Sequence, residues 1–313
     1  MYLIRKIYKK EEKRIMKIKI MCTSTGCIEY APVRYRNLGI DIIRVHVFFD
    51  GKEYLEGLDL DPVDFYDRLE KLENPKDNLP YTGMPTIEEI KGHYEKAIDE
   101  GYDEIIVFAI SSGLGGTYNE LRLVAKDYED KIKIHVVDTK ITTFNEGMLA
   151  VRAKEFADRG MSSEEILKEV KWMMDRQVFM GIDAKLDYLI YNGRLKGGKA
   201  FMGQMLKICP VVHFNEKGEC VALESVRTPK KAMARTCEIL KEIIGNRDSA
   251  DYMLWHVYTG PSQISVLKEI ETKYGIKTNH ESVIMSPVSG AHNGPWLAGY
   301  GYLPLRREDE PLE

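Results

Sequence analysis

The chain has 313 residues, a formal net charge of −4 at pH 7 and a hydrophobic fraction of 44%. This length allows two domains with a buried core each, and the composition is that of a folded globular protein, which argues against disorder. Basic and acidic residues are interspersed, and no zinc-finger or basic-zipper pattern occurs, so we expect no nucleic-acid partner.

Residues 1–16 are rich in lysine and arginine, but they contain no apolar segment or small-residue cleavage site typical of a signal peptide. We interpret them as a frayed N-terminal extension, with a short helix lying on an anionic surface as the alternative. No apolar stretch approaches the roughly 20 residues that cross a bilayer, so we expect no stable membrane insertion.

Residues 17–160 alternate between strand-like and helix-like segments, which favours a parallel sheet flanked by helices. The strands are expected at residues 17–23, 40–49, 104–110 and 133–139, and the helices at 87–101, directly after 118, and at 144–160. The last helix should end at Gly160, because glycine readily adopts the conformation that terminates helices. We therefore predict a Rossmann-like N-terminal α/β domain over residues 17–160.

A second alternation follows, and it begins with a capping-box pattern at Ser162 and Glu165 that should start a helix. Strands are then expected at residues 178–182, 209–215, 220–225, 251–258 and 282–286, and helices near 229–244 and 261–274. The pattern predicts a C-terminal α/β domain over residues 161–305 and a tail over 306–313. In open parallel sheets, ligands bind in the crevice beyond the carboxyl ends of the strands.

Cysteines and histidines show no metal-binding pattern. The five cysteines are spread along the chain without a CxxC, so they indicate free thiols in a reducing cytoplasm. No HExxH or i, i+4 histidine pair occurs, and we expect no metal site. His46, His135, His213 and His256 lie in strand-like runs and should be satisfied or edge histidines, whereas His292 lies in a Gly/Ser/Asn-rich loop and is expected to face a ligand.

Four polar loops are the candidate ligand contacts. Residues 23–26, 111–118 and 286–295 each follow a predicted strand, and residues 81–85 form a predicted turn that leads into a helix. The run SSGLGGTY at 111–118 links a predicted strand to a predicted helix through glycines and hydroxyl-bearing residues. Such a loop at the start of a helix is a common anion-binding site, or anion cradle.

Two chemical interpretations of this cradle are weaker. A dinucleotide site would use Asp138 for the ribose, but the third glycine of G-x-G-x-x-G falls at Tyr118, and no P-loop occurs. A nucleophilic enzyme would pair Ser111 or Ser112 with His292 and an aspartate, although there is no G-x-S-x-G elbow. This second interpretation, an enzyme acting on a small acyl or phosphoryl substrate, stays open as an alternative.

Binding without chemistry fits the same loops. Backbone N–H groups, hydroxyls and an imidazole suit a carboxylate or a phosphate monoanion. Between residues 172 and 206 the chain also carries flexible apolar side chains that could surround an acyl chain, with ordinary core packing as the alternative. The acyl-chain candidates are Phe179, Ile182, Met202, Met205 and Leu206.

Taken together, these loops resemble the DegV family of bacterial lipid-binding proteins, from about residue 17 to residue 303. The family's opening T-D-S loop corresponds to residues 22–24, its T-S-x-P turn to 82–85 and its S-S-x-L-S-G-T-Y loop to 111–118. Its L-x-x-L-x-x-G-G-R segment corresponds to residues 186–197, and the segments 207–212, 226–232 and 290–295 follow in the expected order.

The resemblance implies two α/β domains that hold a long-chain fatty acid between them, without catalysis and without another cofactor. It implies that the acid is presented to a separate fatty-acid kinase. By the same resemblance the carboxylate is held by Thr82, position 115 and His292, with Ser112 and Gly116 beside them. Arg194 and Arg227 are candidates for the rim of the site or for a partner contact.

Two positions depart from the family pattern, because Gly115 replaces a serine and Thr23 replaces an aspartate. Losing a hydroxyl that binds a charged group costs about 1.5–3 kcal/mol. A buried chain of 16 carbons contributes on the order of 10 kcal/mol before entropy costs, at about 0.8 kcal/mol per methylene. Lipid binding should therefore survive the change, while the head-group preference could differ, as in a divergent paralogue with an altered ligand.

Overall fold

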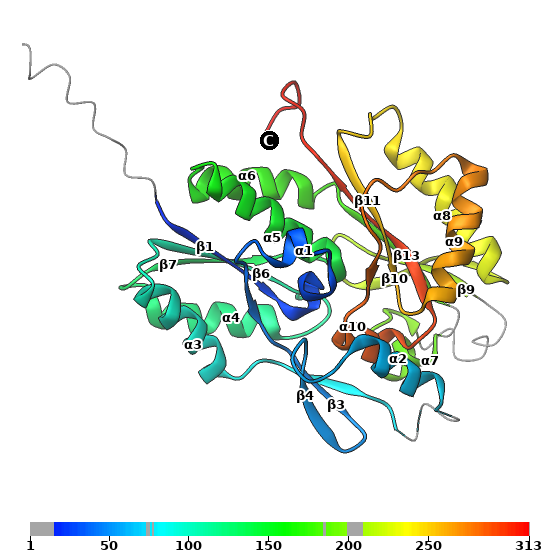
Figure 1. Ribbon diagram of the computed structural model, residues 1–313, viewed down its shortest axis with the longest axis horizontal. Coiled ribbons are helices and arrows are strands. Elements are labelled where there is room, and N and C mark those ends of the chain that lie inside the picture. Colours follow the sequence, from blue (N-terminus) through cyan, green and yellow to red (C-terminus); the bar gives the residue numbers. More distant parts are fainter. Residues whose placement is uncertain (1–15, 73–75, 77, 184–185, 199–208, 313) are drawn as a thin grey trace, which may run out of the picture.

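The computed structural model describes residues 16–72, 76, 78–183, 186–198 and 209–312 (Figure 1). These residues form a mixed α/β fold with one four-stranded, one six-stranded and one three-stranded sheet. The predicted α/β class, with a parallel sheet flanked by helices, is confirmed.

The four-stranded sheet is fully parallel and has the order β2-β1-β6-β7. Its strands are β1 (Ile18–Thr23), β2 (Asp41–Ile43), β6 (Glu104–Ala109) and β7 (Lys133–Asp138). One face packs against α3 (Ile87–Asp99) and α4 (Thr117–Ala125), and the other packs against α5 (Thr143–Asp158). Figure 1 shows these helices on opposite sides of the sheet. Both faces are covered, which explains why its strands are apolar runs without alternation.

The six-stranded sheet has the order β10-β9-β8-β13-β11-β12 and is antiparallel except for the β11–β12 pair. Its strands are β8 (Val178–Asp183), β9 (Cys209–Phe214), β10 (Cys220–Val226), β11 (Tyr252–Tyr258), β12 (Val283–Ile284) and β13 (Leu297–Pro304). Helices α8 (Pro229–Ile244) and α9 (Pro261–Tyr274) cover one face. The second alternation of strands and helices therefore builds a largely antiparallel sheet, with a β9–β10 hairpin and a strand inserted between β8 and β11.

That inserted strand, β13, lies in the middle of the sheet and was not expected from the sequence. Gly299 and Gly301 lie inside it, and glycines are uncommon in the interior of a strand. A Cβ at Gly299 would clash with the Met180 carbonyl, and one at Gly301 would clash with the Trp255 ring. The glycines are therefore needed for close packing inside the sheet.

The segment predicted as one strand over residues 40–49 divides between two sheets. Residues 41–43 form β2, whereas β3 (His46–Phe49) pairs with β4 (Lys52–Leu55) and β5 (Tyr81–Gly83) in the small antiparallel sheet. At the break, the Val45 N–H donates to Ser24 Oγ at 3.0 Å instead of to a strand neighbour. The expected turn at 81–85 thus begins as a strand, and the helix after it starts at a capping box of Thr86 and Glu89.

Five further α-helices complete the described part of the chain. They are α1 (Val33–Arg36), α2 (Pro62–Glu70), α6 (Ser163–Met174), α7 (Asp187–Tyr191) and α10 (Pro287–Asn293), with 3-10 turns at Ser24–Gly26, Ile28–Tyr30 and Lys126–Tyr128. The capping box predicted at Ser162 and Glu165 is present at the start of α6. The predicted loop 286–295, in contrast, contains α10.

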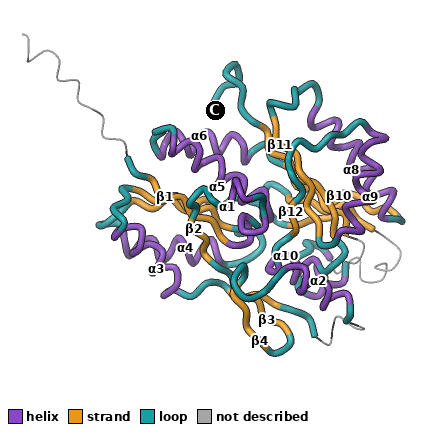
Figure 2. Tube along the Cα trace, in the orientation of Figure 1, coloured by secondary structure: helices purple, strands orange, loops and turns teal. Residues whose placement is uncertain are grey.

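Helix α5 joins the two large sheets (Figure 2). Asn145 Nδ2 donates to the carbonyl oxygens of Val178 and Tyr302, each at 3.2 Å, and Phe144 packs edge-on against Trp255 at 5.4 Å. One apolar core therefore runs from the first sheet to the second. The predicted domain division near residue 160 falls in the turn between α5 and α6 and stays a prediction.

Candidate functional site

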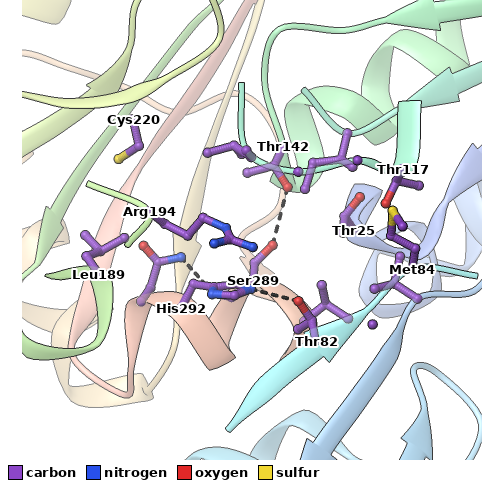
Figure 3. A pocket seen from close by; sticks show the side chains of 18 of the residues that line it. Thr25, Thr82, Met84, Thr117, Thr142, Leu189, Arg194, Cys220, Ser289 and His292 are labelled. Carbon is purple, nitrogen blue, oxygen red and sulfur yellow. Dashed lines mark hydrogen bonds between the residues drawn. The ribbon is translucent and has the colours of Figure 1, made fainter. Parts of the chain in front are cut away.

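A cavity lies where the loops of the parallel sheet meet β5, α10 and the second sheet (Figure 3). The empty space between its walls is about 730 Å³, part of which is open to solvent. Its polar side chains are Thr25, Thr82, Thr117, Thr142, Arg194, Ser289, His292 and Asn293. Its apolar walls are Val45, Met84, Ile110, Leu114, Leu189, Phe214, Cys220 and Val288.

Thr82 and His292 meet in this cavity although they are far apart in the sequence. Thr82 Oγ1, on β5, is 2.9 Å from His292 Nε2, on α10 (Figure 3). Enclosure of the ring, with a smaller effect from the nearby Arg194 charge, lowers the pKa of His292 to about 3. The imidazole is therefore neutral at physiological pH, and its Nδ1 has no hydrogen-bond partner among the described residues.

A buried carboxyl group holds the start of α10. Glu56 Oε1 accepts a hydrogen bond from the Val288 N–H at 2.9 Å, and Ser286 Oγ accepts one from the Ser289 N–H at 3.3 Å. Burial raises the pKa of Glu56 to about 7. These bonds fix the helix that carries Ser289 and His292 into the cavity.

A second buried carboxyl group lies behind the cavity wall. Glu146, at the start of α5, accepts hydrogen bonds from Thr23 and, at 2.7 Å, from the cavity residue Thr25. Burial raises the pKa of Glu146 to about 8. Neither this glutamate nor Glu56 was expected from the sequence. The position of Glu146 among apolar residues at the start of a predicted helix could have indicated that it is buried.

Arg194, predicted for the rim, contributes to the cavity wall itself. Its guanidinium points toward Ser289 and His292 (Figure 3), and its Nη1 donates to the Asn192 carbonyl oxygen at 2.9 Å. Within the part of the chain that the structure describes, no carboxylate forms an ion pair with it. Arg227, the other rim candidate, is exposed just before α8 and does not line the cavity.

The glycines of the 111–118 loop line the cavity at the start of α4. A Cβ at Gly115 would have no heavy atom within 4 Å, so a serine side chain would fit there. A Cβ at Gly116 would lie 2.7 Å from Met84 Sδ. Both positions therefore offer backbone to the cavity, and only Gly115 leaves room for a side chain.

Ser112, which was expected beside the ligand, instead contacts Asp138. Its backbone N–H and its hydroxyl donate to that carboxylate at 3.0 and 2.5 Å. Ser111 Oγ donates to the Gly218 carbonyl oxygen at 2.8 Å. Neither serine is hydrogen-bonded to His292, whose ring contacts Thr82, so the pairing needed by the nucleophilic alternative is not formed here.

The acyl-chain candidates are spread over different places. Phe179 lines a second cavity next to the first, and Ile182 packs in the core under α8 and α9. Met202, Met205 and Leu206 lie outside the described residues. The apolar walls formed by Leu189, Phe214 and Cys220 were not expected. Leu189 lies within the family-like segment 186–197, which was the available signal for it.

The described residues contain no group of three or more histidines, cysteines or acidic residues that could hold a metal ion. Three histidines of the strands are structural, since His46, His135 and His256 each contact a glutamate at 2.7–3.0 Å. The fourth, His213 on β9, instead lines a second cavity. No helix in the described ranges is long and apolar enough to cross a membrane.

Comparison with known proteins gives consistent matches over nearly the full chain. The family model described as "Uncharacterised protein, DegV family" matches residues 17–305. A DegV domain-containing protein of Listeria innocua is 31% identical over 284 residues, which are 90% of this chain and 97% of the relative.

Two solved structures with similar folds are those of a fatty acid binding DegV family protein from Streptococcus agalactiae and of DegV, a fatty acid binding protein from Bacillus subtilis. The first has a TM-score of 0.83 and 27% identity, and covers 93% of this chain and 100% of its own. The second has a TM-score of 0.79 and 28% identity, and covers 92% of this chain and 99% of its own. With its sequence, its fold and the family motifs around one cavity in agreement, this chain belongs to the DegV family.

Proposed function

We propose that this protein holds a long-chain fatty acid in the cavity at Thr82 and His292 and catalyses no reaction on it. The observation that carries the proposal is the composition of the cavity: a hydrogen-bonded Thr–His pair and an arginine without an acidic partner among the described residues face apolar walls. The fatty acid binding stated for the Streptococcus agalactiae and Bacillus subtilis relatives supports it.

The carboxylate head belongs at the polar end. If the neutral His292 ring donates its Nε2–H to Thr82, the Thr82 hydroxyl hydrogen is free to donate to a carboxylate oxygen. The Arg194 guanidinium supplies the positive charge, and a charge-assisted hydrogen bond from it is roughly twice as strong as a neutral one. Backbone groups of Gly115 and Gly116 at the start of α4 complete the proposed head-group site.

The acyl chain belongs against Leu189, Phe214 and Cys220, which form the apolar wall on the side of the second sheet. At about 0.8 kcal/mol per buried methylene, a chain of 16 carbons contributes on the order of 10 kcal/mol before entropy costs. Met202, Met205 and Leu206 lie between Leu189 and Phe214 in the sequence and stay in the proposal as acyl-chain contacts. Phe179 lines only the second cavity, so it would contact the acyl chain only if the chain reached that cavity.

The test is the affinity of purified protein for palmitate, measured by displacement of a fluorescent fatty acid, in wild type, Thr82→Val and Thr82→Ser. Loss of the hydroxyl in Thr82→Val should weaken binding by several-fold to about a hundredfold, while Thr82→Ser should stay near wild type. Equal affinity of all three would remove Thr82 from the site. Absence of palmitate binding to the wild type would refute the function.

We further propose that the loaded protein presents its acid to a fatty-acid kinase in the cytoplasm, which is what the family resemblance implies. Phosphate transfer from ATP to palmitate should then require both the kinase and this protein. Transfer by the kinase alone at the same rate would contradict this step without affecting the proposal for binding.

A further inference from the structure

A second cavity adjoins the first and has no part in the head-group site. It has about 760 Å³ of empty space between its walls, part of it open to solvent. Its apolar lining is formed by Ile141, Met174, Val178, Phe179 and Phe214, and its polar lining by Lys140, Asp175, Gln177, His213, Asn215 and Glu216. Charged residues stand toward solvent, since the Lys140 and Asp175 side chains are 43% and 49% exposed.

One side chain separates the two cavities. Among the described residues, Phe214 alone lines both. Its ring lies 5.5 Å from the Phe179 ring, on the side of the second cavity. On the side of the first cavity it packs with the cluster that contains Leu189 and Cys220, and Cys220 is also its partner in the β9–β10 register. The ring of Phe214 therefore packs with residues of both cavities.

We propose that Phe214 determines the acyl-chain length that this protein accepts, by closing the first cavity against the second. This inference rests on the proposed fatty-acid function. A chain that reaches the ring gains no further apolar contact unless the ring is displaced. With the ring removed, the end of a longer chain enters the second cavity and contacts Met174 and Phe179.

The physical consequence is a break in the dependence of affinity on chain length. Each methylene buried against apolar walls strengthens binding by about fourfold. Beyond the partition, additional methylenes stay in water or displace a packed aromatic ring, so that gain disappears.

The experiment measures dissociation constants for saturated fatty acids of about 14 to 22 carbons, below their aggregation concentrations, for the wild type and Phe214→Ala. In the wild type, affinity should rise with length and then level off. In Phe214→Ala the rise should continue for several more methylenes, so that the ratio of affinities between the longest acid and palmitate increases at least tenfold. In Met174→Ala, which enlarges only the second cavity, affinity should stop rising at the same chain length as in the wild type.

An equal loss of affinity for every length in Phe214→Ala, or the same limit in both proteins, would overturn the proposal. A wild type that binds none of the acids would instead refute the proposed function. If Phe214→Ala does not fold, as judged by circular dichroism, Phe214→Leu removes the ring at a smaller loss of volume, and the same outcomes decide.

Discussion

At position 115 the cavity wall lacks a side chain, and the space beside it is free. Its φ is not in the left-handed region, so a serine fits there without backbone strain. We expect Gly115→Ser to add a hydroxyl donor for the carboxylate and to tighten palmitate binding by roughly tenfold. Gly92→Ser, at an equally open helical position, is the matched control and should leave affinity unchanged. Weaker binding in Gly115→Ser would indicate a cavity adapted to a different head group.

The buried carboxyl groups predict a dependence of stability on pH. Burial raises the pKa of Glu146 to about 8 and that of Glu56 to about 7, above their ordinary value of 4.5. A raised pKa stabilises the fold below the unfolded-state value, and this contribution is lost as pH rises through the folded-state value. His292, with its pKa lowered to about 3, acts in the opposite direction and reduces stability as pH falls below 6.5.

With two carboxyl groups against one imidazole, the wild type should lose stability between about pH 5 and pH 8. We expect Glu146→Gln to reduce this loss, by on the order of 3 kcal/mol, because glutamine keeps a neutral side chain at every pH. Urea unfolding at both pH values measures the effect. Glu164→Gln, at the exposed start of α6, is the control and should retain the wild-type dependence. A wild type that gains stability toward pH 8 would contradict the burial of these groups.

At the scale of elements, the tip of the β9–β10 hairpin is held against the loops of the parallel sheet. Gly218 accepts a hydrogen bond from Ser111 Oγ, and a Cβ at Gly218 would clash with that oxygen and lie 2.9 Å from Lys140 Cα. The hairpin carries Phe214 and Cys220, which line the cavity. The close approach of two backbones at this glycine therefore positions one wall of the site.

Gly218→Ala should displace the hairpin tip, destabilise the fold by about 1–3 kcal/mol and speed dissociation of bound palmitate. Gly275→Ala provides a matched control, because Gly275 has a φ of +69°, close to the +72° of Gly218, but no heavy atom within 4 Å of its Cβ position. Both variants strain the backbone equally, and only the first meets a clash. Equal stability and equal dissociation rates in the two variants would mean that the hairpin contact does not position the wall.

At the scale of the whole molecule, the two large sheets share one apolar core. Helix α5 packs on the parallel sheet and bonds through Asn145 to β8 and β13, and Phe144 contacts Trp255. We therefore expect both halves to unfold together. Tryptophan fluorescence comes from Trp172, Trp255 and Trp296, which all belong to the C-terminal half, although Trp255 contacts Phe144 of α5, whereas far-ultraviolet circular dichroism reports on both halves.

The two signals should give coincident urea transitions with one midpoint. A circular-dichroism transition separated from the fluorescence transition would show instead that the halves unfold independently. That outcome would favour autonomous domains divided near residue 160.

Site residues that lie within short loop motifs could be predicted from the sequence. Thr82 and His292 were named from their loops, and they lie 2.9 Å apart in the structure. Glu56, Glu146 and the position of Arg194 within the wall were not accessible in this way. A charged residue in a helix or a loop is normally solvated, and its burial depends on partners distant in the sequence.

The sequence by itself determined the α/β class, the helices α3 to α6, α8 and α9, the capping box of α6, and the polar loops around the cavity, because apolar periodicity and capping residues act over a few positions. The tertiary structure alone decided that residues 40–49 divide between two sheets, that β13 enters the second sheet between β8 and β11, and that Ser112 contacts Asp138. These outcomes depend on which distant strands and side chains contact one another. The free energy of such contacts cannot be read from any local segment of the sequence.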